Sequence, residues 1–176
     1  AGALVKQFFD QQQFAIDHKD GENNLVTEVD QASERLIVAN IKQHFPDHGY
    51  IGEEYGNAQE DADYQWVIDP IDGTVNFAHG VPLCCVSIGV AYKGDVVMGA
   101  VYNPMMGELY FAEKGKGAFL NDKPIQVSKK SNFNTAFLVT GFPYHFPEGI
   151  DPVKVFAHFA NKKMPLRRLG SAALDL

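Results

Sequence analysis

The sequence contains very few cysteines, and this scarcity excludes one class of protein. Only two of the 176 residues are cysteines, Cys84 and Cys85, and they are neighbours within an apolar run. Adjacent residues on a strand point to opposite faces, so this pair is poorly placed to form a disulfide. A small scaffold held together by disulfides is therefore excluded. We expect two reduced core thiols in a cytoplasmic protein.

Long apolar runs and positive charge are also scarce. Because there is no run of 18 apolar residues and no signal-peptide pattern, we expect neither membrane insertion nor export. The chain has 15 Lys and Arg against 22 Asp and Glu, a formal net charge of −7. Nucleic acids are bound through basic surfaces, so this charge argues against nucleic acid as the main partner.

One long segment has no basic residue at all. Between Gln43 and Tyr92 there is no Lys or Arg, whereas the same span carries eight Asp and Glu. An acidic field of this kind, with no cation nearby in sequence, favours bound metal ions.

The centre of that segment is the stretch from Trp66 to Thr74. Its apolar start predicts a buried strand over 66–68 that ends at Asp69. A turn at Pro70 and Gly73 can then bring the carboxylates of Asp69 and Asp72 to one side of the strand end. Converging carboxylates repel each other unless a cation lies between them, and Mg²⁺ prefers oxygen ligands.

The alternative is an ordinary turn that Asp69 caps. Glu53 and Glu54, which follow a short apolar stretch upstream, favour the metal site, as does the hydroxyl of Thr74. Gly73 and Thr74 are predicted to begin a helix, where free backbone N–H groups receive phosphate oxygens.

Apolar periodicity and turn residues predict alternating helices and hairpins. The expected elements are a helix over 1–14, a loop over 17–28, a helix over 30–45, strands at 50–51, 66–68, 84–91, 96–102, 108–113 and 135–140, a helix over 151–161 and a helix starting at 174–176. This order predicts an α+β fold with a largely antiparallel sheet. Asp30 stands where the second helix begins, so helix capping is its simplest interpretation.

These motifs resemble the inositol monophosphatase family. Gly52 to Glu54 and Trp66 to Phe77 resemble the family signature, Leu25 to Asp30 its upstream Val-Thr-x-x-Asp element, and Arg168 to Ala173 the start of its substrate-binding half. The resemblance runs from about Leu4 to the last residue, in the family's order. It implies a layered α/β/α/β/α sandwich of the inositol monophosphatase and fructose-1,6-bisphosphatase type. It also implies an N-terminal metal- and phosphate-binding domain over 1–134 and the beginning of a substrate-binding α/β domain over 135–176.

The resemblance further implies a reaction and the residues that perform it. The implied activity is hydrolysis of inositol monophosphate to inositol and phosphate by a water that two or three Mg²⁺ ions activate. The implied metal ligands are Glu53, Asp69, the Ile71 carbonyl and Asp72, the catalytic residues are Asp30, Glu53 and Thr74, and the substrate contacts are Asp72, Gly73, Thr74, Gly170, Ser171 and Ala172. Glu54 is a weaker candidate, and a solvated neighbour remains its alternative. We expect inhibition by Li⁺, a small phosphorylated polyol as substrate, and a homodimer.

Other functions stay open. They are a related sugar-bisphosphate or 3′-phosphonucleotide phosphatase, a catalytically silent interaction protein of the same fold, and a calcium-binding module. The spacing of Asp69, Asp72 and Gly73 departs from the calcium-loop pattern.

One element of the family has no counterpart in this sequence. It is the late Trp-Asp-x-Ala-Ala-Gly, whose aspartate binds a second metal in the family, and the sole tryptophan here is Trp66. We therefore expect the chain to be the front two-thirds of a longer enzyme.

Overall fold

The computed structural model describes residues 1–19, 24–142, 149 and 151–176. The helices of this part are α1 (Gly2–Gln11), α2 (Glu28–His44), α3 (Thr74–Ala78), α4 (Pro152–Asn161) and α5 (Ala172–Asp175), with a 3₁₀ turn η1 (Phe133–Thr135). The strands are β1 (Ile16–His18), β2 (Leu25–Thr27), β3 (Gly49–Gly52), β4 (Asn57–Ala58), β5 (Tyr64–Asp72), β6 (Cys85–Tyr92), β7 (Asp95–Asn103), β8 (Glu108–Glu113), β9 (Gly117–Leu120), β10 (Lys123–Ile125), β11 (Leu138–Val139) and β12 (Leu166–Arg167).

Eight of these strands form one sheet in the order β10-β9-β8-β7-β6-β5-β3-β4. All neighbours in it are antiparallel except β3 and β5, which pair in parallel. Two-residue turns explain much of this pattern. Lys93 and Gly94 both have positive φ (50° and 86°), as a tight hairpin turn between β6 and β7 requires. The prediction of a largely antiparallel sheet in an α+β fold is confirmed.

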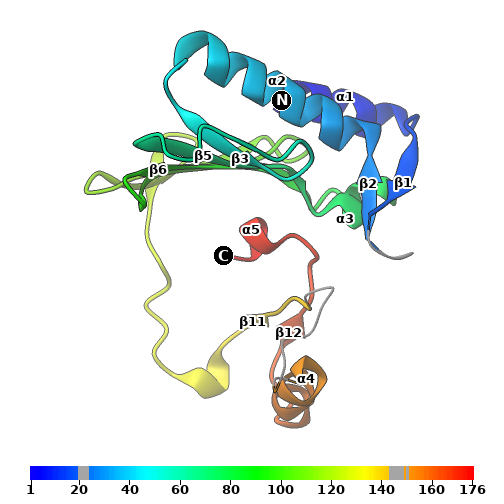
Figure 1. The fold of residues 1–176 in the computed structure, drawn as a ribbon. Coiled ribbons are helices and arrows are strands. Elements are labelled where there is room, and N and C mark those ends of the chain that lie inside the picture. The colour runs from blue at the N-terminus through cyan, green and yellow to red at the C-terminus, as the bar shows by residue number, and fades with distance from the viewer. Residues whose placement is uncertain (20–23, 143–148, 150) are drawn as a thin grey trace.

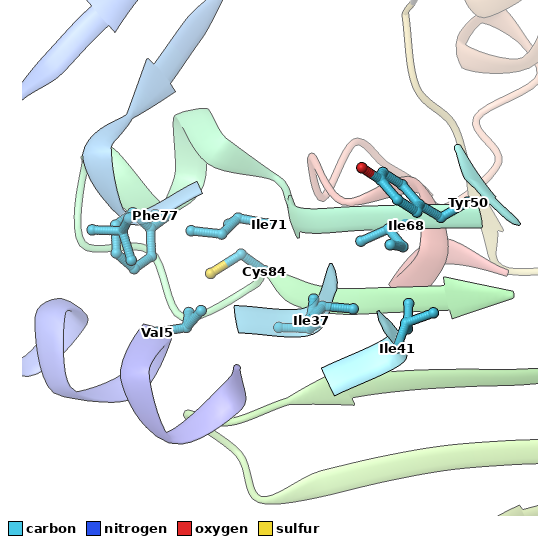
Figure 2. Packing of buried hydrophobic residues seen from close by; sticks show 10 residues of the cluster. Val5, Ile37, Ile41, Tyr50, Ile68, Ile71, Phe77 and Cys84 are labelled. Carbon is cyan, nitrogen blue, oxygen red and sulfur yellow. The ribbon is translucent and has the colours of Figure 1, made fainter. Parts of the chain in front are cut away.

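Helices α1 and α2 lie side by side over one face of this sheet, whereas α5 and the β11–β12 pair lie on the side of the other face (Figure 1). The main core fills the space between the helices and the sheet. Figure 2 shows Ile37 and Ile41 of α2 pointing toward Ile68 of β5, whereas Val5 of α1 lies near Cys84 at the end of the core that Phe77 of α3 occupies. This packing fixes β5 against α2.

Helix α2 begins at Glu28, two residues earlier than predicted, because Thr27 caps it. The Thr27 hydroxyl accepts the N–H groups of Val29 and Asp30, and the Asp30 side chain accepts the N–H of Thr27 in return. This reciprocal capping box satisfies N–H groups that the first helical turn leaves free. The capping interpretation of Asp30 is therefore confirmed.

Three predictions about local structure are wrong in part. The central strand continues through Asp72, with an irregular register between Asp69 and Asp72, because residues beyond Asp69 still pair with β6. Val67 is 48% exposed, since alternate residues of β5 face away from the helices. The expected loop over 17–28 contains part of β1 and all of β2, which pair with each other, and residues 20–23 of it lie outside the described residues.

The strand expected over 135–140 is also shorter than predicted. Asn132 caps the turn η1, so extended structure is limited to β11, which pairs in parallel with β12. No helix within the described ranges is both long and apolar enough to cross a membrane.

Candidate active site

The candidate site is a cavity of about 510 Å³ at the carboxyl end of β5. Its lining comes mostly from three segments that are far apart in sequence, within residues 69–75, 139–142 and 168–176, and is completed by Asn24, Leu25 and Glu53. Every predicted site residue from Glu53 to Thr74 lies on this cavity, and so do Gly170, Ser171 and Ala172. Asp30 reaches it from α2 through Thr74.

Asp69 is one of two cavity carboxylates, with Asp175, that have a buried oxygen without a hydrogen-bond partner among the described residues. Its Oδ1 atom is buried and has no hydrogen-bond partner. Burial, followed by the negative charges of Glu53 and Asp72, raises the pKa of Asp69 to about 8. A carboxylate that is costly to ionise in isolation becomes favourable to ionise beside a cation, so this environment fits a metal ligand.

Asp72, in contrast, is surrounded by donors. Its Oδ2 accepts hydrogen bonds from the Ser171 hydroxyl at 2.6 Å, the Ala173 N–H at 2.7 Å and, more weakly, the Cys85 thiol at 3.7 Å. Its Oδ1 accepts the Ala172 N–H at 3.1 Å. Asp72 thereby joins the end of β5 to the first turn of α5.

Thr74 links the cavity to the buried capping residue of α2. Its Oγ1 lies 3.0 Å from Asp30 Oδ1 and 2.9 Å from the Ile71 carbonyl oxygen, and either of these oxygens can accept its proton. The hydroxyl has one proton to donate, so its lone pairs remain free to accept a hydrogen bond from another molecule. Burial raises the pKa of Asp30, although hydrogen bonds from Thr27 and Thr74 oppose this. Two of the residues implied to be catalytic, Asp30 and Thr74, are therefore in direct contact.

Gly73 and Thr74 stand at the start of α3, as predicted. Gly73 occupies the capping position with φ 92°, and a β-carbon there would lie only 3.0 Å from the Leu83 carbonyl oxygen. Glycine is required for both reasons, because other residues disfavour this conformation and would be crowded. No side chain caps the helix at this position.

Glu53 forms an ion pair that the sequence did not indicate. Lys19 Nζ lies 2.7 Å from Glu53 Oε1 and 2.5 Å from Glu54 Oε1. Burial lowers the pKa of Lys19, but the hydrogen bonds and charges of both glutamates outweigh burial and raise it. The acidic segment itself contains no Lys or Arg, as the sequence shows, but this lysine from outside it compensates two of its carboxylates. The side chain of Glu54 is only 6% exposed, so the alternative that it is a solvated neighbour is wrong.

Glu53, Asp69 and Asp72 line one cavity but do not form a preformed ligand cluster. Among the described residues, no group of three or more His, Cys, Asp or Glu side chains is arranged to hold a metal ion. The reason lies in the partners above: Lys19 holds Glu53, and the start of α5 holds Asp72. The donor set and the unpartnered oxygen of Asp69 nevertheless suit a hard divalent cation. The assignment of metal ligands stays a prediction.

Gly170 to Ala172 reach the cavity because Asn76 holds the preceding backbone. The Asn76 side-chain amide donates to the carbonyls of Leu83 and Leu169, each at 2.7 Å. Gly170 has φ 92°, and a β-carbon there would lie 2.9 Å from the Asn76 side chain. This bridge spans 93 residues of sequence, and no local pattern could have revealed it.

Arg168, Phe142 and Asp175 also line the cavity and were not predicted. Arg168 is the one basic residue among the described lining, and its guanidinium lies 5.3 Å from the ring centre of Phe142. Burial, and then the charge of Asp72, raise the pKa of Asp175. The cavity therefore combines several carboxylates on one side with a single cation on the other.

The family model, the sequence relatives and the solved structures all point to one family. The model of the inositol monophosphatase family matches residues 1–176. The chain is 42% identical to an inositol-1-monophosphatase of Synechocystis sp. over 163 residues, which are 92% of this chain and 57% of that protein. It is 41% identical to the Nus factor SuhB of Pseudomonas aeruginosa over 169 residues, 92% of this chain and 62% of that protein.

A solved structure shares the fold. The extragenic suppressor protein suhB of Bartonella henselae superposes with a TM-score of 0.88 at 32% identity, covering 99% of this chain and 67% of that one. The chain thus spans less than two thirds of the length of the two curated relatives above.

Proposed function

Because the chain belongs to the inositol monophosphatase family, we propose that its cavity is the active site of a Mg²⁺-dependent phosphomonoesterase that releases phosphate from inositol monophosphate. One observation carries the proposal. Asp69 places a buried, unpartnered carboxylate oxygen in a cavity that Glu53, the Ile71 region and Asp72 also line. Such a site lowers its free energy by taking up a cation.

Glu53, Asp69, the Ile71 carbonyl and Asp72 would hold the ions. When bound, Mg²⁺ supplies positive charge that screens a phosphate dianion and makes a neighbouring water more acidic. Asp69 would contribute its unpartnered Oδ1. Glu53 would exchange the ammonium of Lys19 for the metal, and this exchange keeps the carboxylate compensated throughout.

Thr74 and Asp30 would orient and deprotonate the attacking water. When the Thr74 hydroxyl donates to Asp30, its oxygen accepts a hydrogen bond from the water and directs the water's lone pair toward phosphorus. Burial raises the pKa of Asp30, which makes its carboxylate a stronger base than an exposed aspartate.

Asp72 and the first turn of α5 would bind the alcohol part of the substrate. Asp72 already accepts hydrogen bonds there from Ser171 and two backbone N–H groups, so it is held in one orientation. Hydroxyl groups of a polyol can donate to the remaining lone pairs of this carboxylate. Gly73 and Thr74 would contact the phosphate at the start of α3.

The experiment is a panel of phosphate esters, assayed for phosphate release by the full-length protein with Mg²⁺ and with EDTA. We expect inositol monophosphate to be the best substrate, activity to be lost in EDTA, and millimolar Li⁺ to inhibit at limiting Mg²⁺. A preference for fructose bisphosphate or phosphoadenosine phosphate would instead identify a sugar-bisphosphate or a 3′-phosphonucleotide phosphatase. Equal phosphate release in EDTA would refute the proposal.

A second candidate rests on the relatives named Nus factor SuhB, which are as similar to this chain as the phosphatases are. A protein of this kind could act by binding another macromolecule with the cavity unused. The two functions are separated by the same panel: an interaction protein without catalysis would release no phosphate from any ester.

A further inference from the structure

Glu34 is a carboxylate buried where no charge is expected. It lies on α2 and its exposed fraction is 0%. Among the described residues no ion pair to it is formed, and its partners are backbone groups instead. Its Oε2 accepts the N–H of Glu54 at 2.8 Å and its Oε1 accepts the N–H of Tyr55 at 3.0 Å. Burying a carboxylate is costly unless such hydrogen bonds compensate, so this position has a specific role.

The backbone that Glu34 holds is the one that carries Glu53. Gly52 lies so close to the Glu34 carboxylate that a β-carbon there would overlap it. Glu34 thus packs against Gly52, the residue before Glu53, and accepts a hydrogen bond from the N–H of Glu54, the residue after it. This one side chain therefore holds the backbone on both sides of Glu53.

Two neighbours on the same face of α2 hold the other strand end of the cavity, residues 69–75. Ser33, also 0% exposed, donates its hydroxyl to the Pro70 carbonyl at 3.2 Å, and Asp30 contacts Thr74. Residues three and four positions apart on a helix face the same side. Three buried polar side chains of α2 are therefore attached to two separate segments of the site: Glu34 to residues 52–55, and Ser33 and Asp30 to residues 69–75.

We propose that Glu34 is a positioning residue for metal binding, because it fixes the backbone of residues 52–55 and so aims Glu53 into the cavity. This inference rests on the proposed function. Groups that orient a metal ligand usually contribute 10- to 100-fold to metal affinity. Glu34→Gln keeps the volume but offers only one acceptor oxygen for the two N–H groups, so it should weaken metal binding by about 10-fold or more.

The test uses the full-length protein and Mn²⁺ as the metal probe, with affinity measured by calorimetry. Amide exchange at Glu54 and Tyr55 should be faster in Glu34→Gln than in the wild type. Ile37→Val, which shortens a core side chain of the same helix, is the matched control and should leave Mn²⁺ affinity unchanged. Should Glu34→Gln fail to fold, Glu34→Met preserves the apolar packing and removes both acceptors.

A double-mutant cycle with Glu53→Gln separates positioning from general stability. If Glu34 acts through Glu53, adding Glu34→Gln to Glu53→Gln should cause no further loss of Mn²⁺ affinity. Additive losses, or equal Mn²⁺ affinity in the wild type and Glu34→Gln, would overturn the inference. Mn²⁺ binding that depends on Glu34 in a protein that releases no phosphate would support the inference and overturn the proposed function. A wild type that binds no Mn²⁺ would overturn both.

Discussion

At the scale of single residues, the carboxylates of the cavity have three different environments. Asp69 has an oxygen with no partner, Asp72 is surrounded by donors, and Glu53 pairs with Lys19. Environment rather than residue type decides which of them needs a cation. We therefore expect the same substitution to have different effects at the three positions.

Removing the Thr74 hydroxyl should separate catalysis from metal binding. Thr74→Ala should reduce turnover by ~10²–10⁴, the usual range for an acid–base group, because the link between the water and Asp30 is lost. The affinity for Mg²⁺ should change little, because the Ile71 carbonyl, and not the Thr74 side chain, is assigned as a metal ligand. Steady-state kinetics and a Mg²⁺ titration measure both quantities. Thr74→Ser is the control and should retain most activity; a large shift in Mg²⁺ affinity for Thr74→Ala would place Thr74 among the ligands.

Removing Lys19 should strengthen metal binding. The ammonium of Lys19 competes for Glu53, so Lys19→Met should lower the Mg²⁺ concentration needed for half-maximal activity by up to about fivefold, the equivalent of about 1 kcal/mol for a partly exposed ion pair. Lys6→Met removes an exposed lysine paired with Asp10 on α1 and is the control for net charge. A higher Mg²⁺ requirement for Lys19→Met would show that Lys19 supports the metal site.

Asp69 should make the stability of the metal-free protein depend on pH. Its pKa is about 8 in the folded chain, mainly because of burial, and about 3.9 when unfolded. The folded pKa is the higher one, so the contribution of Asp69 to stability is complete below about pH 4 and is lost as pH rises through 8. In EDTA, the melting temperature of the wild type should fall over this range more than that of Asp69→Asn. Equal falls would contradict the assigned environment.

At the scale of helices and strands, the sequence predicted those elements whose ends are determined by nearby turn or capping residues. The hairpin between β6 and β7 and the helix α4, which begins after the Asp151 cap, follow from turn and capping residues. The β1–β2 pair and the extension of β5 through Asp72 were missed, because pairing with a neighbouring strand decides them.

In the site, too, some residues were predicted from nearby sequence and others were missed. Glu53, Asp69, Asp72 and Thr74 were found because they surround turn residues in one recognisable stretch. Lys19, Glu34 and Asn76 were missed, because each acts on a segment at least 20 residues away or through backbone groups that have no sequence signature.

Asn76 should stabilise the junction between α3 and the β12–α5 connection. Asn76→Ala leaves the Leu83 and Leu169 carbonyls without their donor and should lower the free energy of unfolding by about 1–3 kcal/mol. Asn76→Asp should cost more, because a carboxylate would then face two carbonyl oxygens. Urea unfolding measures both. Asn40→Ala, at an exposed asparagine of α2, is the control, and an equal effect there would refute the bridging role.

At the scale of the whole molecule, the cavity is a meeting point of distant segments. The end of β5 and the start of α3 line one part of it, and the residues around α5 line another (Figure 1). Asp72 and Asn76 make the hydrogen bonds that join these parts. The acidic balance of the chain, with a formal net charge of −7, is compatible with an anionic substrate only if cations screen the carboxylates of the cavity.

The most direct test of that claim is phosphate release from inositol monophosphate across a Mg²⁺ titration, for the full-length wild type and Asp69→Asn. Asp61→Asn, at an exposed aspartate outside the cavity, serves as the control. We predict activity that depends on Mg²⁺ in the wild type and in Asp61→Asn. In Asp69→Asn we predict a loss of about 10³-fold or more that added Mg²⁺ does not restore. A loss of less than about tenfold in Asp69→Asn, or wild-type activity independent of Mg²⁺, would contradict a metal site centred on Asp69.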